Sequence, residues 1–297
     1  MSGRGAFGRR GPWRGRQAGG SADGISEAGA RREVIEGFDL DGFVRATLAE
    51  DLGAAGDITS AAVIPAEARF RGVMDSRDAI VVAGLWLAEA FFRALDPEVE
   101  IERLVEDGAR VPAGTDLLRV SGRARALLTA ERSALNVVQH LSGVATLTRA
   151  YVDAIAGTGA VLLDTRKTLP GLRLLEKYAT RTGGAKNHRM GLWDAAMIKD
   201  NHVAVAGSVR AAAARARDVG IAEIVVEVDR VGQIEEALEG GATHLLLDNM
   251  DPATLREAVA VVAGRVPTER RPRRISGWIS PRHRRAKTVI PGLTRDP

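Results

Sequence analysis

Hydrophobic and polar positions divide the chain into two differently patterned parts. Between about residues 38 and 123, short apolar runs alternate with turn signals such as Asp107-Gly108, which is typical of a compact α+β region. We expect helices at 41–50 and 85–95, and strands at 70–74, 79–83, 98–105 and 117–120. Residues 124–155 then show one long helical period, weakened only at Ser142-Gly143. This stretch predicts a connecting helix between the two parts.

Strands and helices alternate after the long helix. The pattern predicts strands at 161–163, 195–198, 224–228 and 244–247, and helices at 171–178, 208–216, 232–239 and 252–262. Repeated strand-helix units of this length indicate a parallel sheet. Charged and polar residues follow the predicted strands, at the edge where an α/β barrel places its active site. We therefore favour a barrel over an open sheet.

Two terminal segments lack this periodicity. Residues 1–35 are rich in Gly, Arg and Ser, and residues 270–297 combine four prolines with dense Arg. Segments that cannot bury apolar surface do not form a packed core. We expect both to be disordered tails.

The charge of the chain is concentrated in these tails. The formal net charge is +4, but residues 1–35 hold seven Arg against three acidic residues. Residues 270–297 hold nine basic residues against one acidic residue, so the body from 36 to 269 is near −8. An acidic body argues against nucleic-acid binding. The absence of cysteine excludes a disulfide framework and suits the cytoplasm, and no apolar run reaches the length of a membrane span.

Three polar clusters stand at the ends of separate apolar segments. They are Thr165-Arg166-Lys167, Asn187-His188-Arg189 and Lys199-Asp200-Asn201-His202. Cations that converge at loop ends bind carboxylate-rich or phosphorylated small molecules. The alternatives are a solvated loop pair at Arg166 and Lys167 and a structural role for His188. Lys199 closes an apolar strand, so we expect its stem to be buried and its ammonium to have a partner.

Glu227 and Asp248 occupy matching positions at the ends of the runs IVVEV and HLLLDN. Each could simply cap the following helix. Opposite three cationic loops, they also suit a magnesium-bound substrate or a positively charged transition state. A lysine at a strand end leaves open a different chemistry, a Schiff-base aldolase that uses Lys199.

A long central run carries a resemblance to a known family. DTRKTLPGLRLLEKYATRTGGAKNHRMGLWDAAMIKDNH, preceded by TAERSALNVVQHLSGVAT and followed by VVEVD and LLLDNM, closely resembles quinolinate phosphoribosyltransferases. The resemblance covers about residues 36–269. It implies an N-terminal α+β sandwich domain at 36–123, an incomplete α/β-barrel domain at 124–269, and a homodimer.

The activity that the resemblance implies belongs to NAD biosynthesis. A phosphoribosyl group passes from phosphoribosyl pyrophosphate to quinolinate with decarboxylation, which gives nicotinate mononucleotide, CO2 and pyrophosphate. Magnesium is implied as the cofactor. A related phosphoribosyltransferase for another ring acid remains an alternative.

The resemblance also assigns roles to particular residues. Arg132, otherwise an exposed partner of Glu131, is implied to reach into the neighbouring subunit's site and hold quinolinate. Glu227 and Asp248 are implied to contact the ribose and its magnesium, and together with Lys167 and Lys199 they are the expected catalytic residues. Binding of the quinolinate carboxylates and the pyrophosphate is implied for Thr165, Arg166, Lys167, His188, Arg189 and Lys199.

The chain departs from the family after VAVVAGRVPTE. The family continues with a Ser-Gly-Gly loop and a Gly-Ala-Leu-Thr-His-like turn, which hold the 5′-phosphate through backbone N–H groups. Here the tail reads RRPRRISGWISPRHRRAKTVIPGLTRDP, in which Ser276-Gly277 is a weak echo. We expect a barrel truncated after about four strands, a reading frame shifted near Glu269 or Arg270, and weak or no turnover. A truncated, binding-only relative is the corresponding alternative.

Overall fold

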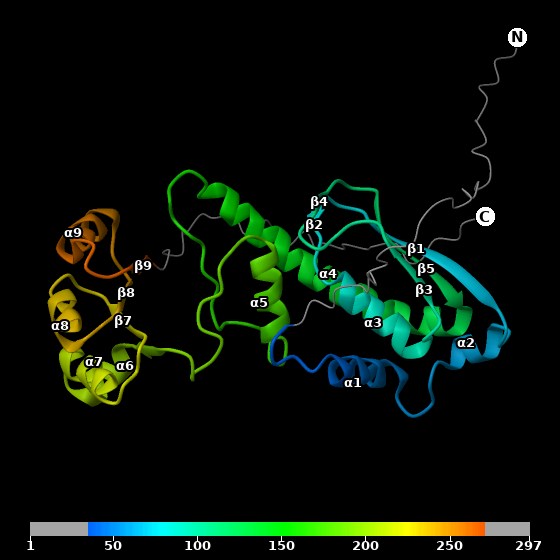
Figure 1. Ribbon diagram of the computed structural model, residues 1–297, viewed down its shortest axis with the longest axis horizontal. Helices are drawn as coiled ribbons and strands as arrows, with labels where there is room; N and C mark the ends of the chain where they lie inside the picture. Colours follow the sequence, from blue (N-terminus) through cyan, green and yellow to red (C-terminus); the bar gives the residue numbers. More distant parts are fainter. Residues whose placement is uncertain (1–34, 271–297) are drawn as a thin grey trace, which may run out of the picture. The chain divides into compact units, whose positions relative to one another are not determined.

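The computed structural model of the protein describes residues 35–270. The predictions for the tails, including the shifted reading frame, lie outside these residues. Within them, Figure 1 shows an antiparallel sheet with its helices and a parallel sheet with its own, joined in sequence by one long helix. No helix of this described part is both long and apolar enough to cross a membrane.

The N-terminal region is built on an antiparallel sheet in the order β1-β5-β3. Phe91, Phe92 and Leu117 are fully buried in the core that covers it. The remaining strands β2 and β4 form a separate antiparallel pair. The elements are α1 (Leu40–Leu52), α2 (Ile58–Val63), β1 (Arg69–Ser76), β2 (Ile80–Val81), α3 (Leu85–Leu95), β3 (Glu100–Arg103), β4 (Arg110–Val111) and β5 (Thr115–Arg123).

Helix α4 (Ala124–Ala154) packs into two hydrophobic cores. Its N-terminal half contributes Leu127 and Val138 to the core of the antiparallel sheet. Its C-terminal half contributes Leu141 and Ala145 to a second core, which includes Tyr178 of α5 (Arg173–Thr182). The predicted long helix is confirmed, and it packs against both the antiparallel-sheet region and α5.

The second region is a parallel sheet in the order β6-β7-β8-β9. Its central strand reads IVVEV and buries four of its five residues, the near-continuous apolar pattern of a strand covered on both faces. The strands are β6 (Ala196–Ile198), β7 (Ile224–Val228), β8 (His244–Leu247) and β9 (Thr268–Arg270), and the helices are α6 (Asp200–Ala206), α7 (Val209–Asp218), α8 (Gln233–Gly240) and α9 (Pro252–Val262). The expected α/β class with a parallel sheet is confirmed.

The strand predicted at 161–163 is wrong. Only one parallel bridge forms there, between Leu163 and Lys186. Two backbone hydrogen bonds support it, from Asp164 N to Lys186 O at 3.1 Å and from Lys186 N to Leu162 O at 2.9 Å. A contact of this length makes no ladder, and β6 pairs with β7 instead. The fourth strand of the sheet is β9, which sequence analysis did not predict.

Two short helices were also missed. No helix was predicted between residues 50 and 70, where the structure has α2, and its start is fixed by Asp57 accepting a hydrogen bond from Ser60 N at 2.9 Å. Arg125 of α4 donates from Nε to Ile64 O at the other end, at 2.8 Å. Contacts distant in sequence therefore stabilise a segment with little periodicity of its own. The loop expected after Lys199 likewise forms α6.

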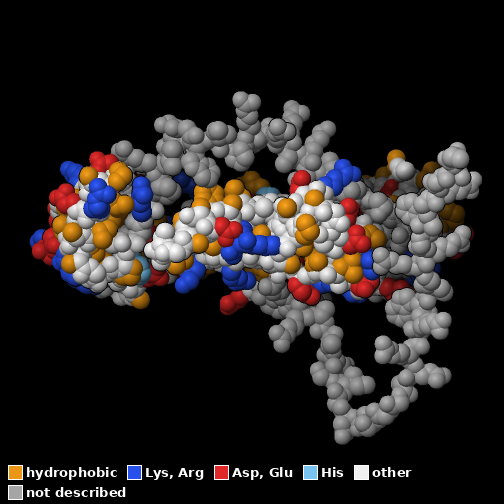
Figure 2. Space-filling view, turned by 90° about the horizontal axis from the view of Figure 1, so that it is seen from above, with side chains coloured by type: hydrophobic (Ala, Val, Ile, Leu, Met, Phe, Trp, Pro, Cys, Tyr) orange, Lys and Arg blue, Asp and Glu red, His pale blue; other side chains and the backbone are white. Residues whose placement is uncertain are grey.

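Charged side chains of both signs are interspersed on the face shown in Figure 2. Lys and Arg side chains of the described residues do not gather there into one basic surface. This mixed surface agrees with the near-neutral to acidic composition of the body, in which 36–269 carries about −8.

Candidate functional site

The carboxyl edge of the parallel sheet brings together three predicted residues. Lys199 follows β6, Glu227 lies near the end of β7, and Asp248 follows β8. Neighbouring parallel strands end at the same edge, so their terminal side chains meet. Lys199 Nζ lies 2.7 Å from Glu227 Oε2. The partner expected for Lys199 is therefore Glu227, although the lysine side chain keeps 33% of its surface exposed.

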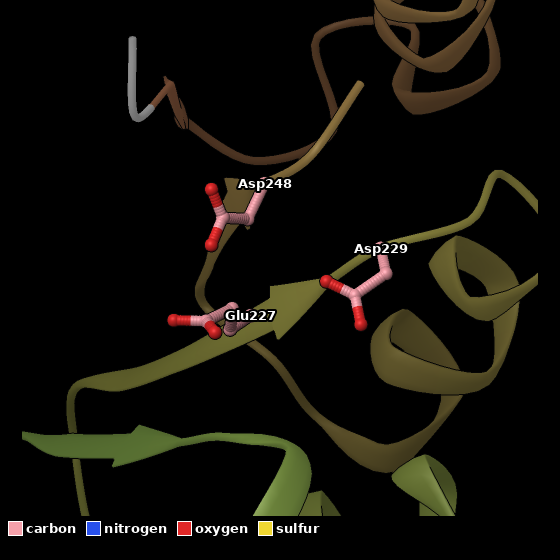
Figure 3. A group of neighbouring side chains, drawn as sticks. All are labelled: Glu227, Asp229 and Asp248. Atoms are coloured by element: carbon pink, nitrogen blue, oxygen red, sulfur yellow. The ribbon is translucent and has the colours of Figure 1, made fainter. Parts of the chain in front are cut away.

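An acidic group forms at this edge, as Figure 3 shows. Carboxylate oxygens of Glu227, Asp229 and Asp248 lie within 4.8 Å of one another. Hard oxygen donors of this kind suit Mg²⁺, so the residues fit the ion that the resemblance implies. Sequence analysis missed Asp229. The signal was available, because residues two apart in an extended strand share a face.

His188 lies against β9. Its Nε2 is 3.2 Å from Glu269 Oε1, an ion pair without hydrogen-bond alignment. The nearby Glu269 carboxylate raises the pKa of His188, and this outweighs burial and the repulsion of Lys177 and Arg189, which lower it. Its Nδ1 accepts a hydrogen bond from Arg189 N at 2.7 Å. Glu269 was missed because it reaches the site only through the pairing of β9 with β8.

Two guanidinium groups, those of Arg166 in the first polar cluster and Arg189 in the second, lie close together. Burial lowers the pKa of Arg189, and repulsion from Arg166 lowers it further. Arg189 Nη1 donates to Ala195 O at 3.1 Å. Arg166 Nε is buried and has no hydrogen-bond partner in the described part of the chain. A buried donor beside a second cation is satisfied best by an anion, which is the chemistry predicted for these residues.

Thr165 and Lys167 line a cavity of about 290 Å³. Lys167 N donates to Thr165 Oγ1 at 3.0 Å, which holds the backbone in a tight turn. The cavity is also lined by Leu147 and Tyr151 of α4. These two predicted residues therefore face a space with both polar and apolar walls.

Sequence analysis missed the buried lysine beneath these loops. Lys177 of α5 is 1% exposed, and its Nζ is 2.5 Å from Asp164 Oδ1. The sequence did contain a signal. Lys177 lies three residues after Leu174 and directly before Tyr178, so it borders the apolar side of helix α5. Lysine on a short helix is more often solvated, which is why it was not selected.

Arg132 is separate from the other predicted residues. It is exposed on α4, whereas Lys199, Glu227 and Asp248 lie at the carboxyl edge of the parallel sheet. Burial raises the pKa of its neighbour Glu131, and the charge of Arg132 partly offsets this rise. One chain does not bring Arg132 into the site.

Two family descriptions match the chain consecutively. Residues 57–142 match "Quinolinate phosphoribosyl transferase, N-terminal domain", and residues 144–281 match "Quinolinate phosphoribosyl transferase, C-terminal domain". Together they cover most of the chain, and their boundary falls at Gly143 inside α4.

Individual relatives agree with this match. The chain is 47% identical over 234 residues to the nicotinate-nucleotide pyrophosphorylase [carboxylating] of Mycobacterium leprae, covering 76% of this chain and 80% of the relative. It is 38% identical over 253 residues to quinolinate phosphoribosyltransferase [decarboxylating] 1b of Nicotiana tabacum, covering 78% and 71%. Among solved structures, NadC from Streptococcus pyogenes superposes with a TM-score of 0.76 at 39% identity, covering 79% of this chain and 83% of that one.

Proposed function

The chain belongs to the quinolinate phosphoribosyltransferase family, and from this premise we propose that its site joins quinolinate to phosphoribosyl pyrophosphate with loss of CO2. The product is nicotinate mononucleotide, a precursor of NAD. The observation that carries the proposal is the carboxyl edge of the sheet, where Lys199 faces the carboxylates of Glu227, Asp229 and Asp248.

Quinolinate carries two carboxylates, and two partly buried arginine side chains are suited to hold them. Arg166 Nε has no partner within the described residues, and the pKa of Arg189 is lowered first by burial and then by Arg166. An anion between them would satisfy the free donor and relieve the repulsion. His188 beside them adds a third polar group, and Thr165 completes the binding set that we propose.

The acidic group is proposed to handle the ribose and the magnesium ion. Glu227, Asp229 and Asp248 would hold Mg²⁺, which when bound neutralises charge on the pyrophosphate. The same carboxylates stabilise positive charge that develops on the ribose carbon. Lys167 and Lys199 stabilise the negative charge on the departing pyrophosphate. The site thus supplies opposite charges for the two sides of the breaking bond.

The reaction consists of one substitution and one decarboxylation. The pyridine nitrogen attacks the ribose carbon as the bond to the pyrophosphate oxygen breaks, and the oxygen takes the electron pair. The alkylated ring is then cationic, so it accepts the electron pair of the carbon–carboxylate bond as CO2 leaves. A proton takes the vacated position. The protein needs only to orient the carboxylate, since the ring itself is the electron sink.

A homodimer is part of the proposal. Arg132 is exposed and separate from the other site residues of its own chain, so it is free to reach the site of a second copy and hold quinolinate there. Cytoplasmic location is proposed as well, and cell fractionation would test it.

The alternative functions would require other chemical properties of the same residues. A Schiff-base aldolase needs a neutral amine at Lys199, whereas Nζ lies 2.7 Å from the Glu227 carboxylate. This pairing argues against the aldolase. A binding-only relative would bind quinolinate without turnover, and a relative for another ring acid would prefer a different substrate.

The test is an assay of the full chain with quinolinate, phosphoribosyl pyrophosphate and Mg²⁺, with nicotinate mononucleotide detected by chromatography. We expect slow formation of product, with CO2 released in equal amount, and no CO2 when phosphoribosyl pyrophosphate is omitted. Quinolinate binding without product under these conditions would support the binding-only alternative. Trapping of a carbonyl substrate by borohydride would support the aldolase.

A further inference from the structure

A buried cluster of polar side chains lies beneath the cationic loops. It consists of Asp164, Lys177, Thr180 and Asn187, and we name it the Asp164 cluster. The side chains of Lys177 and Asp164 are 1% and 5% exposed. An ammonium and a carboxylate removed from water to this extent are costly unless every polar atom is satisfied.

The cluster is densely hydrogen-bonded. Asp164 Oδ1 accepts from Lys177 Nζ at 2.5 Å, and Asp164 Oδ2 accepts from Asn187 Nδ2 at 2.7 Å. Thr180 Oγ1 donates to the same Oδ2 at 3.3 Å, and Asn187 Nδ2 also donates to Lys177 O at 2.9 Å. Three separate segments are thus joined at a single carboxylate.

The backbone of His188 is held by this cluster on both sides. Its N–H donates to Asp164 Oδ1 at 2.8 Å, and its carbonyl accepts from Lys177 Nζ at 2.9 Å. Thr165 is the next residue after Asp164, and Arg189 is the next after His188. Thr165 and Arg189, two of the proposed substrate-binding residues, therefore each directly follow a residue that the cluster holds in place.

We propose that Asp164 and Lys177 are positioning residues, which fix the peptide of His188 and thereby set the distance between the two cationic loops for a dicarboxylate substrate. This inference rests on the proposed function. Lys177 has a second effect, because it neutralises Asp164. An unneutralised carboxylate there would attract Arg166 and Arg189 and compete with the substrate for them.

The positive charge of Lys177 also affects the pKa of a proposed substrate-binding residue, His188. This charge is among the factors that lower the pKa of His188, against the larger raising effect of Glu269. The ammonium hydrogen-bonds the backbone carbonyl of His188, and it acts on the imidazole ring as a nearby charge.

A purely structural ion pair is the competing explanation, and a double variant separates the two. Asp164→Leu combined with Lys177→Met replaces the pair by apolar side chains of similar size, which commonly preserves stability. We expect a folded protein with a somewhat lower melting temperature, since Asn187 Nδ2 and His188 N–H lose their acceptor. The Kd for quinolinate should be weakened about 100-fold, the size of effect that a small misplacement of positioned groups has. Asp164→Asn combined with Lys177→Gln retains donors and acceptors, and it should recover part of the affinity.

Asp96→Asn is the matched control. Asp96 is 2% exposed, accepts from Arg123 N at 2.7 Å, and lies in the N-terminal region. Its loss should lower the melting temperature and leave quinolinate binding unchanged. Calorimetric titration of the full chain with quinolinate gives the Kd, and hydrogen exchange of the His188 amide reports on the backbone directly.

The outcomes separate this inference from the proposed function. Faster exchange of the His188 amide together with weaker quinolinate binding in a well-folded Leu/Met variant supports the positioning role. Wild-type affinity or unchanged exchange in that variant overturns it. A wild-type protein that neither binds nor converts quinolinate refutes the proposed function instead, and the exchange measurement still decides whether the cluster holds His188.

Discussion

Two arginine side chains of the site lie close together, although the proximity of like charges does not stabilise the fold. Arg166 and Arg189 repel each other, and Arg166 keeps a buried donor without a partner in the described chain. Strain of this kind persists where a ligand relieves it. Sequence analysis identified both residues from their loop positions. Lys177 was not selected, because a lysine on a short helix is more often solvated, and the fold shows its partner Asp164.

Replacing Arg189 tests the anion role at this scale. Arg189→Ala should raise the KM for quinolinate about 30-fold, since a hydrogen bond to a charged group contributes about 2 kcal/mol. Arg189→Lys keeps the positive charge but loses the planar guanidinium group, so its KM should lie between the KM of the wild type and that of Arg189→Ala. Steady-state kinetics gives both values. Arg265→Ala, which removes an exposed ion pair with Glu235, is the control, and an equal KM effect there would contradict the specific role.

The ionisation of His188 gives a second test. Glu269→Gln removes the carboxylate that raises the pKa of His188, so the pKa should fall. The stabilisation from this pair is complete below the unfolded pKa of about 6.5 and is lost as the pH rises through the raised folded pKa. Titration of the His188 ring resonance measures the shift. The resonance of His140, which pairs with Glu176, should not move, and an unshifted His188 would show that Glu269 does not control it.

Elements with strong local patterns were predicted well. Helix α3 and strands β7 and β8 have the predicted bounds, because an apolar stripe or a buried run determines them locally. Elements that depend on distant contacts were not predicted. Helix α2 is held by Arg125 from α4, β9 exists only by pairing with β8, and the segment at 161–163 lacks a partner long enough for a ladder.

The start of α7 offers a test of element stability. Ser208 Oγ accepts from Ala211 N at 3.1 Å as the N-cap of the helix. Ser208→Ala should lower the free energy of unfolding by about 1 kcal/mol. Ser208→Asp also provides a capping oxygen and should retain most of the stability. Denaturant titration distinguishes them, and equal losses would mean that the cap contributes little.

At the scale of the whole molecule, the position of Arg132 predicts a dependence on a second copy. Lys199, Glu227 and Asp248 lie together at the sheet edge, and Arg166 lies close to Arg189. Arg132 is exposed elsewhere, on α4. Sequence analysis anticipated this separation only through the family resemblance. Spacing along the chain cannot show it, because the contact that Arg132 would make is between subunits.

A mixing experiment tests this dependence. Arg132→Ala and Lys199→Ala should each abolish most turnover when pure. Dimers reassembled from equal amounts of both should recover about a quarter of the wild-type activity, because half of the dimers then hold one intact site. Activity assays after mild denaturation and refolding measure the recovery. If the mixture is as inactive as its components, Arg132 acts within its own chain or not at all.

The packing of helix α4 into two cores affects how the chain folds during its synthesis. Leu127 and Val138 belong to the first core and Leu141 and Ala145 to the second, so no cut between the two family segments leaves either with a complete helix. On the ribosome, the N-terminal region is synthesised first, and its Trp86 and Leu87 can already pack with Leu141 in the second core. That core is completed only when α5 emerges with Leu175, Tyr178 and Ala179, so part of the apolar face of α4 stays exposed in the nascent chain until then.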